Sequence, residues 1–218
     1  MTTQGISLRH YATVVFDCDG VVLNSNKIKT KAFYQATLPY GRAAAEAMVE
    51  YHINNGGVSR YKKFEYFLEQ IAKIDADRRQ LDLKSLLDTY AGYVKNGLLD
   101  CEIAPGLAAL RHETSNTKWL IVSGGDELEL RDIFKKRGIS EWFNGGIFGS
   151  PRTKEEILNT EINSGSLKFP AIFFGDSTYD YRAAKSANLD FVFVSGWSEL
   201  ENWTEWVSVN KIIHQSFI

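Results

Sequence analysis

The chain has 218 residues, 44% of them hydrophobic and 24% charged, with a formal net charge of −2. These values are ordinary for a globular protein and exclude the strongly basic surface of a typical nucleic-acid-binding protein. Only Cys18 and Cys101 occur, which argues against a disulfide framework. No apolar run approaches the ~20 residues that span a bilayer, and the opening MTTQGISLRH has no apolar signal-peptide core. We therefore expect a soluble, cytoplasmic protein that binds neither nucleic acid nor membrane.

Short apolar segments that end in Asp, Ser or Gly predict β-strands. They are residues 12–17 (ATVVFD), 118–123 (KWLIVS), 171–175 (AIFFG) and 191–195 (FVFVS). Segments that are apolar at nearly every position are typical of strands buried on both faces, as in a parallel sheet covered by helices.

Helical patterns separate these predicted strands. Asp126 begins the pattern ELELRDIFKKR, and Ser177 or Thr178 caps the pattern YDYRAAKSAN. Residues 197–218 predict a short helix and one more apolar stretch. Alternating strands and helices indicate an open α/β sheet, in which functional groups gather at the carboxyl ends of the strands.

Residues 26–100 interrupt this alternation, because they contain several helical patterns and no convincing strand. An all-helical insert of this size, directly after the first strand, predicts a separate cap. We therefore expect an α/β core with a doubly wound, Rossmann-like parallel sheet from residues 1–24 and 101–218. Residues 25–100 are expected to form a helical cap that closes over the active site.

Polar and small residues follow the ends of the predicted strands. They are Asp17 and Asp19 after the first, Ser123, Gly124 and Gly125 after the second, and Asp176 and Asp180 in GDSTYD, with Lys154 before the third. Because the carboxyl ends of parallel strands meet at one edge of a sheet, these groups are expected to converge there.

The chemistry open to such a set is narrow. Clustered carboxylates without His or Cys favour a hard, oxygen-binding cation, with Mg²⁺ as the default. Ser123, its neighbouring N–H groups and Lys154 suit a phosphate, since they combine donors in a small loop with one positive charge. A carboxylate between metal and phosphate is able to act as a nucleophile and form an aspartyl-phosphate. Unit charges about 4 Å apart repel by ~4 kcal/mol at an effective dielectric of about 20, so cation and lysine must offset that repulsion.

These residues resemble the four signature motifs of the haloacid dehalogenase superfamily. The motifs occur here in the family's order as DCDG, SGG, Lys154 and GDSTYD. The helical insert between the first two motifs is similar to that of the phosphoglycolate phosphatase and β-phosphoglucomutase branch. The resemblance covers residues 13–196. One departure is Asn24, which stands where many relatives carry Asp.

The resemblance implies roles for the three aspartates nearest the metal. Asp17 would be the nucleophile and a ligand of Mg²⁺. Asp19 would protonate the leaving oxygen, later activate water, and ligate the metal through its backbone carbonyl. Asp176 would complete the metal ligands from the chain.

The resemblance also implies how the phosphoryl group is held. Ser123 and Gly124 would bind it, and Lys154, preferred over Lys168, would bridge the nucleophile and the phosphate. Asp180 would hold Lys154 or a metal-bound water.

One segment of the predicted cap resembles the G-x-S-R sequence with which caps of the β-phosphoglucomutase branch reach the substrate. Residues 56–60 read GGVSR, which implies that Arg60 binds a second anionic group or sugar hydroxyls. The alternative is a loop-to-helix junction with Ser59 as N-cap. The lysines at positions 27, 29 and 31 are predicted to form a solvated helix face, and the four histidines to be structural or surface groups.

The function predicted from these features is Mg²⁺-dependent hydrolysis of a small phosphate monoester, either a sugar phosphate or an organic-acid phosphate. One alternative is a hexose phosphomutase of the β-phosphoglucomutase type, suggested by the GVSR segment. Another is a catalytically silent binding module, which would have lost the nucleophile or the lysine. The partner is expected to be a small phosphorylated metabolite, and nothing in the sequence specifies which one or the oligomeric state.

Overall fold

A computed structural model describes residues 7–218, so the first six residues of the predicted core segment 1–24 lie outside the described part. Within residues 7–218, six parallel strands form one sheet with the order β3-β2-β1-β4-β5-β6. The strands are β1 (Thr13–Phe16), β2 (Lys118–Asp126), β3 (Gly146–Ser150), β4 (Ala171–Gly175), β5 (Asp190–Val194) and β6 (Ile213–Gln215). The predicted parallel α/β sheet is confirmed.

The strand order changes direction at β1. The chain proceeds from β1 through β2 to β3 on one side, and the later strands β4, β5 and β6 continue on the other side. In such sheets ligands bind beyond the carboxyl ends of the strands, at the point where the order reverses. The residues directly after β1, including Asp17, therefore lie at the position where a site is expected.

The helices fall into an inserted group and a flanking group. The insert contains α1 (Asn26–Thr37), α2 (Arg42–Asn54), α3 (Arg60–Tyr66) and α4 (Ala76–Asp100), with the short helices η1 (Leu38–Tyr40) and η2 (Phe67–Ile71). The sheet is flanked by α5 (Leu107–Glu113), α6 (Glu127–Lys136), η3 (Ser140–Trp142), α7 (Lys154–Asn163), α8 (Thr178–Ser186) and α9 (Trp203–Val209). No helix in residues 7–218 is long and apolar enough to cross a bilayer.

Successive residues of β1 face opposite sides of the sheet. Val14 and Phe16 belong to a buried cluster that includes side chains of α5 and α6. Val15 belongs to a second cluster, on the other face, with side chains of α7 and α8. Because helices cover both faces, every position of the strand is buried, and this is why the segment is apolar throughout.

Two strands were not predicted from the sequence. The segment of β3, GIFGS, has glycine at two of five positions, and glycine is depleted in strands. Gly149 is required because a Cβ there would lie 2.3 Å from the carbonyl oxygen of Gly125 in the adjoining strand. The edge strand β6 has only three residues, two of them exposed, and so lacks an apolar pattern.

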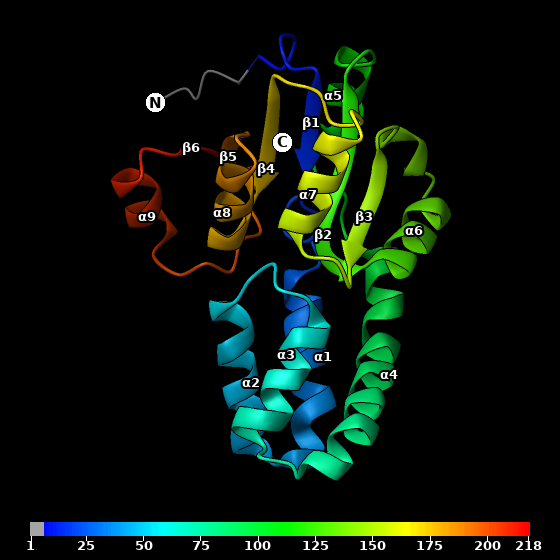
Figure 1. Cartoon of the computed structure of the whole chain (residues 1–218), viewed down its shortest axis with the longest axis vertical. Coiled ribbons are helices and arrows are strands. Elements are labelled where there is room, and N and C mark those ends of the chain that lie inside the picture. The colour runs from blue at the N-terminus through cyan, green and yellow to red at the C-terminus, as the bar shows by residue number, and fades with distance from the viewer. Residues whose placement is uncertain (1–6) are drawn as a thin grey trace.

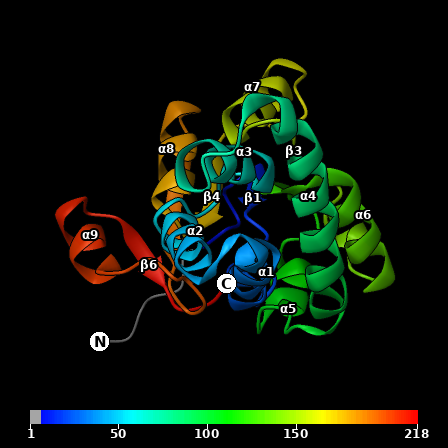
Figure 2. The ribbon, with the colours of Figure 1, turned by 90° about the horizontal axis from the view of Figure 1, so that it is seen from below.

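The inserted helices lie beyond the carboxyl ends of the strands. In Figure 1 the strand arrows point towards α1, α2, α3 and α4, and Figure 2 shows these helices in front of the sheet when it is viewed along the strands. The inserted helices have their own aromatic core, in which Phe33 contacts Phe64 and Tyr90 at centroid distances of 5.1 and 4.5 Å. We propose that these helices form a cap over the α/β core, a division that the sequence analysis places at residues 25–100.

Candidate active site

The side chains that follow the strands converge at one edge of the sheet and are almost completely buried. The buried charged and hydroxyl groups there are Asp17 after β1, Ser123 in β2, Lys154 at the start of α7, Asp176 after β4 and Asp180 in α8. Charged side chains are rarely buried unless they are paired, so their mutual contacts define the site.

Lys154 links two of these aspartates. Its Nζ lies 2.9 Å from Oδ1 of Asp17 and also pairs with Oδ1 of Asp180. Thr153 places the lysine, because its side chain caps α7 and so fixes the first residue of that helix. Lys168, the other lysine considered from the sequence, is exposed.

Asp180 is held by the N-terminus of α8 as well as by Lys154. Its Oδ2 accepts hydrogen bonds from the Asp176 N–H (3.2 Å), the Ser177 N–H (3.1 Å) and the Ser177 hydroxyl (2.6 Å). Ser177 in turn caps the helix by accepting a hydrogen bond from the Asp180 N–H. Both carboxylate oxygens of Asp180 therefore have partners, and the contact with Lys154 favours the predicted role of holding that lysine.

Neighbouring groups balance the negative charges of Asp17 and Asp176 less completely than that of Asp180. Burial raises the pKa of Asp17 to about 7, since repulsion from Asp180 and Asp19 adds to burial and the attraction of Lys154 offsets it only in part. Burial and then repulsion from Asp17 and Asp180 raise the pKa of Asp176 well above its ordinary value. A cation bound between the two carboxylates would favour the ionised form of both.

The donor set fits a hard divalent cation. Oxygen atoms of Asp17, Asp176 and Asp180 lie within 4.8 Å of one another, and no nitrogen or sulfur ligand belongs to this group within the described residues. Asp17 and Asp176 each keep one carboxylate oxygen to which no group in residues 7–218 donates, so these two side chains would hold Mg²⁺. The approach of the chain to Asp176 requires Gly20, because a Cβ at Gly20 would lie 2.1 Å from the Asp176 Oδ2.

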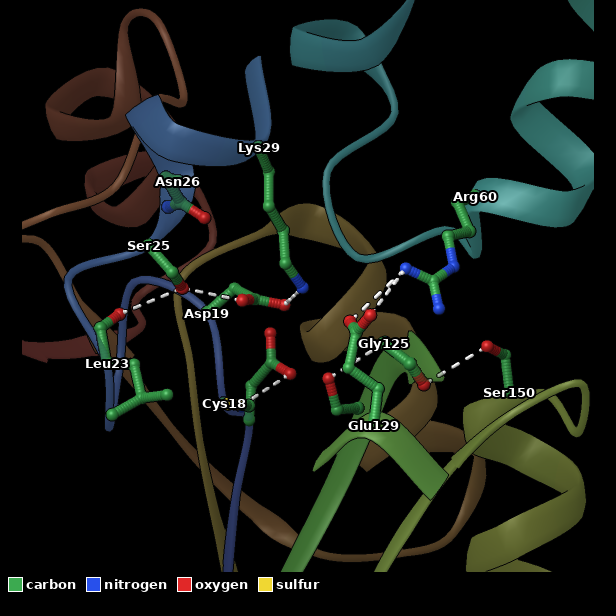
Figure 3. Close-up of polar contacts among 12 residues, drawn as sticks. Cys18, Asp19, Leu23, Ser25, Asn26, Lys29, Arg60, Gly125, Glu129 and Ser150 are labelled. Carbon is green, nitrogen blue, oxygen red and sulfur yellow. Dashed lines mark hydrogen bonds and ion pairs between the residues drawn. The ribbon is translucent and has the colours of Figure 1, made fainter. Parts of the chain in front are cut away.

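Asp19 lies in different surroundings from Asp17. Its carboxylate accepts hydrogen bonds from the Ser25 hydroxyl (2.6 Å) and from Lys29 Nζ (2.5 Å), both near the start of α1 (Figure 3). Burial alone would raise the pKa of Asp19, but the ion pair with Lys29 and the hydrogen bond from Ser25 lower it. Asp19 is therefore an ionised carboxylate that the cap holds in place.

The prediction of a solvated lysine face on the first helix is wrong for Lys29. Lys27 and Lys31 are exposed, as expected, but Lys29 is buried and paired with Asp19. The helix begins immediately after the DCDG loop, so the inward face of its first turn meets the site rather than solvent.

The last residues of β2 have the features of an anion site. Ser123, Gly124 and Gly125 lie within this strand, which extends to Asp126, and not after it as the sequence predicts. The Ser123 Oγ accepts a hydrogen bond from the Gly125 N–H (3.0 Å), so the hydroxyl proton remains available to a ligand. A Cβ at Gly124 would lie 2.1 Å from the carbonyl oxygen of Gly57 in the cap. The glycine at position 124 therefore permits the cap loop to lie directly over this part of the core.

Arg60 lies in the wall of the cavity, but acidic side chains of the core already bind its guanidinium group. Its Nη1 lies 3.1 Å from Oε2 of Glu129 (Figure 3). Its Nη2 lies 3.8 Å from Oδ2 of Asp126. Ser59 caps α3 by accepting a hydrogen bond from the Lys62 N–H (3.4 Å), as the alternative interpretation expects. The segment GVSR therefore forms a helix start and also carries a bridge from cap to core.

The cavity between cap and core contains residues that sequence reasoning missed. Its wall includes Asp17, Asp19 and Asp176 from the core, and Lys29, His52 and Lys63 from the cap. Asn26 also lines it and donates a hydrogen bond to Asp176 Oδ2 (2.7 Å). The closeness of Asn26 and Lys29 to the DCDG motif was a usable signal, whereas nothing in the sequence distinguishes Lys63 from its exposed neighbour Lys62.

Comparison with protein families decides the relationship. The family model described as haloacid dehalogenase-like hydrolase matches residues 14–194. The chain belongs to the haloacid dehalogenase-like hydrolases. The family predicted from the DCDG, SGG and GDSTYD motifs is therefore confirmed. A search among curated proteins finds no match.

Solved structures of haloacid dehalogenase-like proteins share the fold. A predicted phosphatase from Clostridium acetobutylicum has a TM-score of 0.71 at 19% identity, with 94% of each chain covered. A predicted phosphoglycolate phosphatase from Haemophilus somnus has a TM-score of 0.67 at 19% identity, covering 91% of this chain and 90% of its own. A β-phosphoglucomutase from Clostridium difficile has a TM-score of 0.67 at 18% identity, covering 94% and 91%. The similarity extends through the cap to nearly the whole chain.

Proposed function

We propose that this haloacid dehalogenase-like hydrolase is a Mg²⁺-dependent phosphatase that hydrolyses a small phosphate monoester through an aspartyl-phosphate at Asp17. The observation that supports it best is the environment of Asp17: a buried carboxylate that meets Lys154 on one side and the carboxylate of Asp176 on another. Ser123, on the neighbouring strand, supplies a hydroxyl donor for a phosphoryl oxygen. Mg²⁺ held by Asp17, Asp176 and the Asp19 carbonyl would neutralise negative charge between nucleophile and phosphate.

In the first step a carboxylate oxygen of Asp17 attacks phosphorus, and the bond from phosphorus to the ester oxygen breaks. Lys154 and the Ser123–Gly124 loop bind the oxygens of the group in transfer. The leaving oxygen takes a proton from Asp19, so the alcohol departs uncharged. Asp19 must first gain that proton, and a phosphate dianion next to it favours this by raising its pKa.

In the second step the ionised Asp19 takes a proton from water, and the water oxygen attacks the phosphorus of the aspartyl-phosphate. The acyl-phosphate bond breaks, which releases inorganic phosphate and restores the Asp17 carboxylate. The hydrogen bond from Ser25 and the ion pair with Lys29 orient Asp19 for both proton transfers.

A hexose phosphomutase is the second candidate, and the GVSR segment is the observation that favours it. In that reaction a hydroxyl of the substrate, rather than water, would accept the phosphoryl group. A phosphomutase would require a sugar bisphosphate for turnover and would release little inorganic phosphate. The two functions are therefore separated by one assay for phosphate release with and without added bisphosphate.

The test of the proposed function is a screen of phosphorylated sugars and organic acids for release of inorganic phosphate. Wild-type protein with Mg²⁺ should release phosphate from at least one of them. The variants Asp17→Asn and Asp176→Asn should release none, and both should retain the circular dichroism spectrum of the wild type. A wild-type protein that hydrolyses no ester, including p-nitrophenyl phosphate, would contradict the proposal.

A further inference from the structure

Lys63 is a cation in the wall of the cavity that the proposed reaction does not use. The residue lies on α3 of the cap, and only 1% of it is exposed. It lines the same cavity as Asp17 and Asp176, where the substrate would bind. A lysine is almost never buried to this extent unless its charge is balanced.

The contacts of Lys63 do not balance its charge. Its Nζ lies 2.6 Å from Nδ1 of His52 and 3.4 Å from the His52 carbonyl oxygen, and it lies over the ring of Phe33. Burial and the neighbouring Lys63 hold the pKa of His52 well below its ordinary value, so the imidazole is a neutral acceptor. Within residues 7–218, no carboxylate lies at ion-pair distance from the Lys63 ammonium.

The other basic side chains of this wall differ from Lys63 in that respect. Lys29 forms an ion pair with Asp19, and Arg60 forms one with Glu129. Lys63 is thus a buried amino group that faces the cavity, has a neutral partner and lacks a counter-charge to hold its proton. The missing counter-charge is what a bound anion would supply.

We infer that the cavity takes a phosphate monoester whose non-reacting part carries a carboxylate, and that the ammonium group of Lys63 binds this carboxylate. The inference rests on the proposed phosphatase function and narrows its substrate class. A carboxylate fits better than a second phosphoryl group, because one unit of charge matches one lysine. Asp176 and Glu199 already place negative charge in the wall, which disfavours a dianion.

The experiment compares esters that differ only in the anionic group. The probes are 3-phosphoglycerate against glycerol 3-phosphate, and 6-phosphogluconate against glucitol 6-phosphate, with fructose 1,6-bisphosphate against fructose 6-phosphate for a second phosphoryl group. For the wild type we expect kcat/KM to be at least 10-fold higher for the acid in one or both acid–alcohol pairs. In Lys63→Met the same ratio should fall below about threefold through loss of activity on the acid. The exposed control Lys95→Gln should keep the wild-type ratio.

The outcomes separate this inference from the proposed function. If the protein hydrolyses p-nitrophenyl phosphate but hydrolyses the acid and the alcohol of each pair at equal rates, the inference is overturned. The protein would still be a phosphatase. A preference for the bisphosphate over the acids would also overturn it. If Lys63→Met does not fold, as judged by circular dichroism, Lys63→Gln replaces it. A folded variant that keeps the wild-type ratio would show that Lys63 does not bind the carboxylate.

Discussion

Asp17 and Asp19 are separated by one residue and each pairs with a lysine, yet their surroundings shift their pKa values in opposite directions. Asp17 lies among carboxylates that raise its pKa together with burial, whereas the cap lysine Lys29 lowers the pKa of Asp19. A cation bound by Asp17 and Asp176 lowers the pKa of both, and a phosphate dianion beside Asp19 raises the pKa of that residue. In the proposed mechanism, binding of metal and substrate would therefore favour an ionised Asp17 as nucleophile and a protonated Asp19 as acid.

The proton on Lys63 provides a prediction for stability. Burial and then Lys29 lower its pKa to about 7, although Asp19, Glu199 and Asp176 oppose the shift. Above pH 7 the folded protein without substrate therefore binds fewer protons here than the unfolded chain, so stability rises with pH. Between pH 7 and pH 9 the free energy of unfolding of the wild type, relative to Lys63→Met, should increase by about 2 kcal/mol. Urea titrations of both proteins at each pH measure this difference.

The difference in the free energy of unfolding between the wild type and Lys95→Gln should not change with pH. Lys95 is exposed in the folded protein as well as in the unfolded chain. If the free energy of unfolding of the wild type relative to Lys63→Met does not change between pH 7 and pH 9, Lys63 keeps its proton in the folded protein. The groups that face Lys63 are Phe33 and Lys29 on α1, His52 on α2, and Asp19, Asp176 and Glu199 from the core.

The sequence did not allow us to predict which cap lysines are buried. Lys62 and Lys63 are adjacent, and only the packing of α3 against Phe33 and His52 makes one exposed and the other buried. The core residues were predictable because each follows a strand, and the end of a strand fixes where a side chain lies. A helix face has no such marker when several similar residues follow one another.

At the scale of elements, α3 of the cap and α6 of the core are joined by Arg60 and Glu129. A second link is the hydrogen bond from the Tyr61 hydroxyl to Asp126 (2.7 Å), the N-cap of α6. Both links join the cap to the core, and Arg60 also lines the cavity that contains Asp17. Cap closure of this kind excludes water and completes a site, so its loss lowers turnover as well as affinity.

The role of Arg60 can be tested with a double-mutant cycle. If the arginine holds the cap closed through Glu129, Arg60→Ala and Glu129→Gln should each lower kcat/KM about 10-fold, or about 1.4 kcal/mol. The double variant should be no worse than the worse single variant, because both remove one interaction. The control Arg79→Ala removes a cap arginine whose ion pair with Glu69 is exposed, and it should have little effect.

The cycle also tests the interpretation drawn from the GVSR segment. If Arg60 instead binds the substrate directly, Glu129→Gln should leave kcat/KM unchanged or increase it, since it frees the guanidinium group. Additive losses in the double variant would likewise contradict a shared bridge.

Most elements were predictable because their physical signals are local. The buried strands are continuously apolar, and Asp126 and Ser177 mark helix starts by capping them. By contrast, β3 contains two glycines among five residues, and β6 has only three residues, two of them exposed. Their own residues carry weak signals, so pattern alone did not reveal them.

At the scale of the whole molecule, the candidate site lies between the cap and the core. Its buried carboxylates depend on nearby positive charge to remain ionised. We predict that Mg²⁺ raises the thermal midpoint of the protein, because it relieves repulsion between the buried carboxylates of Asp17 and Asp176. The variant Asp176→Asn should lose most of this shift, and the exposed control Asp132→Asn should retain it.

Activity should disappear in EDTA, and Ca²⁺ should not replace Mg²⁺, because it prefers more ligands and a looser geometry. Full activity after EDTA treatment and dialysis would contradict the metal site.

The most direct measurement of the central claim is to trap the aspartyl-phosphate. Reduction of an acyl-phosphate with borohydride converts the aspartate to homoserine, which mass spectrometry of the peptide locates. Protein quenched during turnover of its best ester should carry homoserine at position 17, and only when substrate and Mg²⁺ are both present. Asp17→Asn should show none, with its sequence checked by mass for deamidation. Rapid turnover without modification at position 17, or with modification at Asp19 instead, would contradict the account.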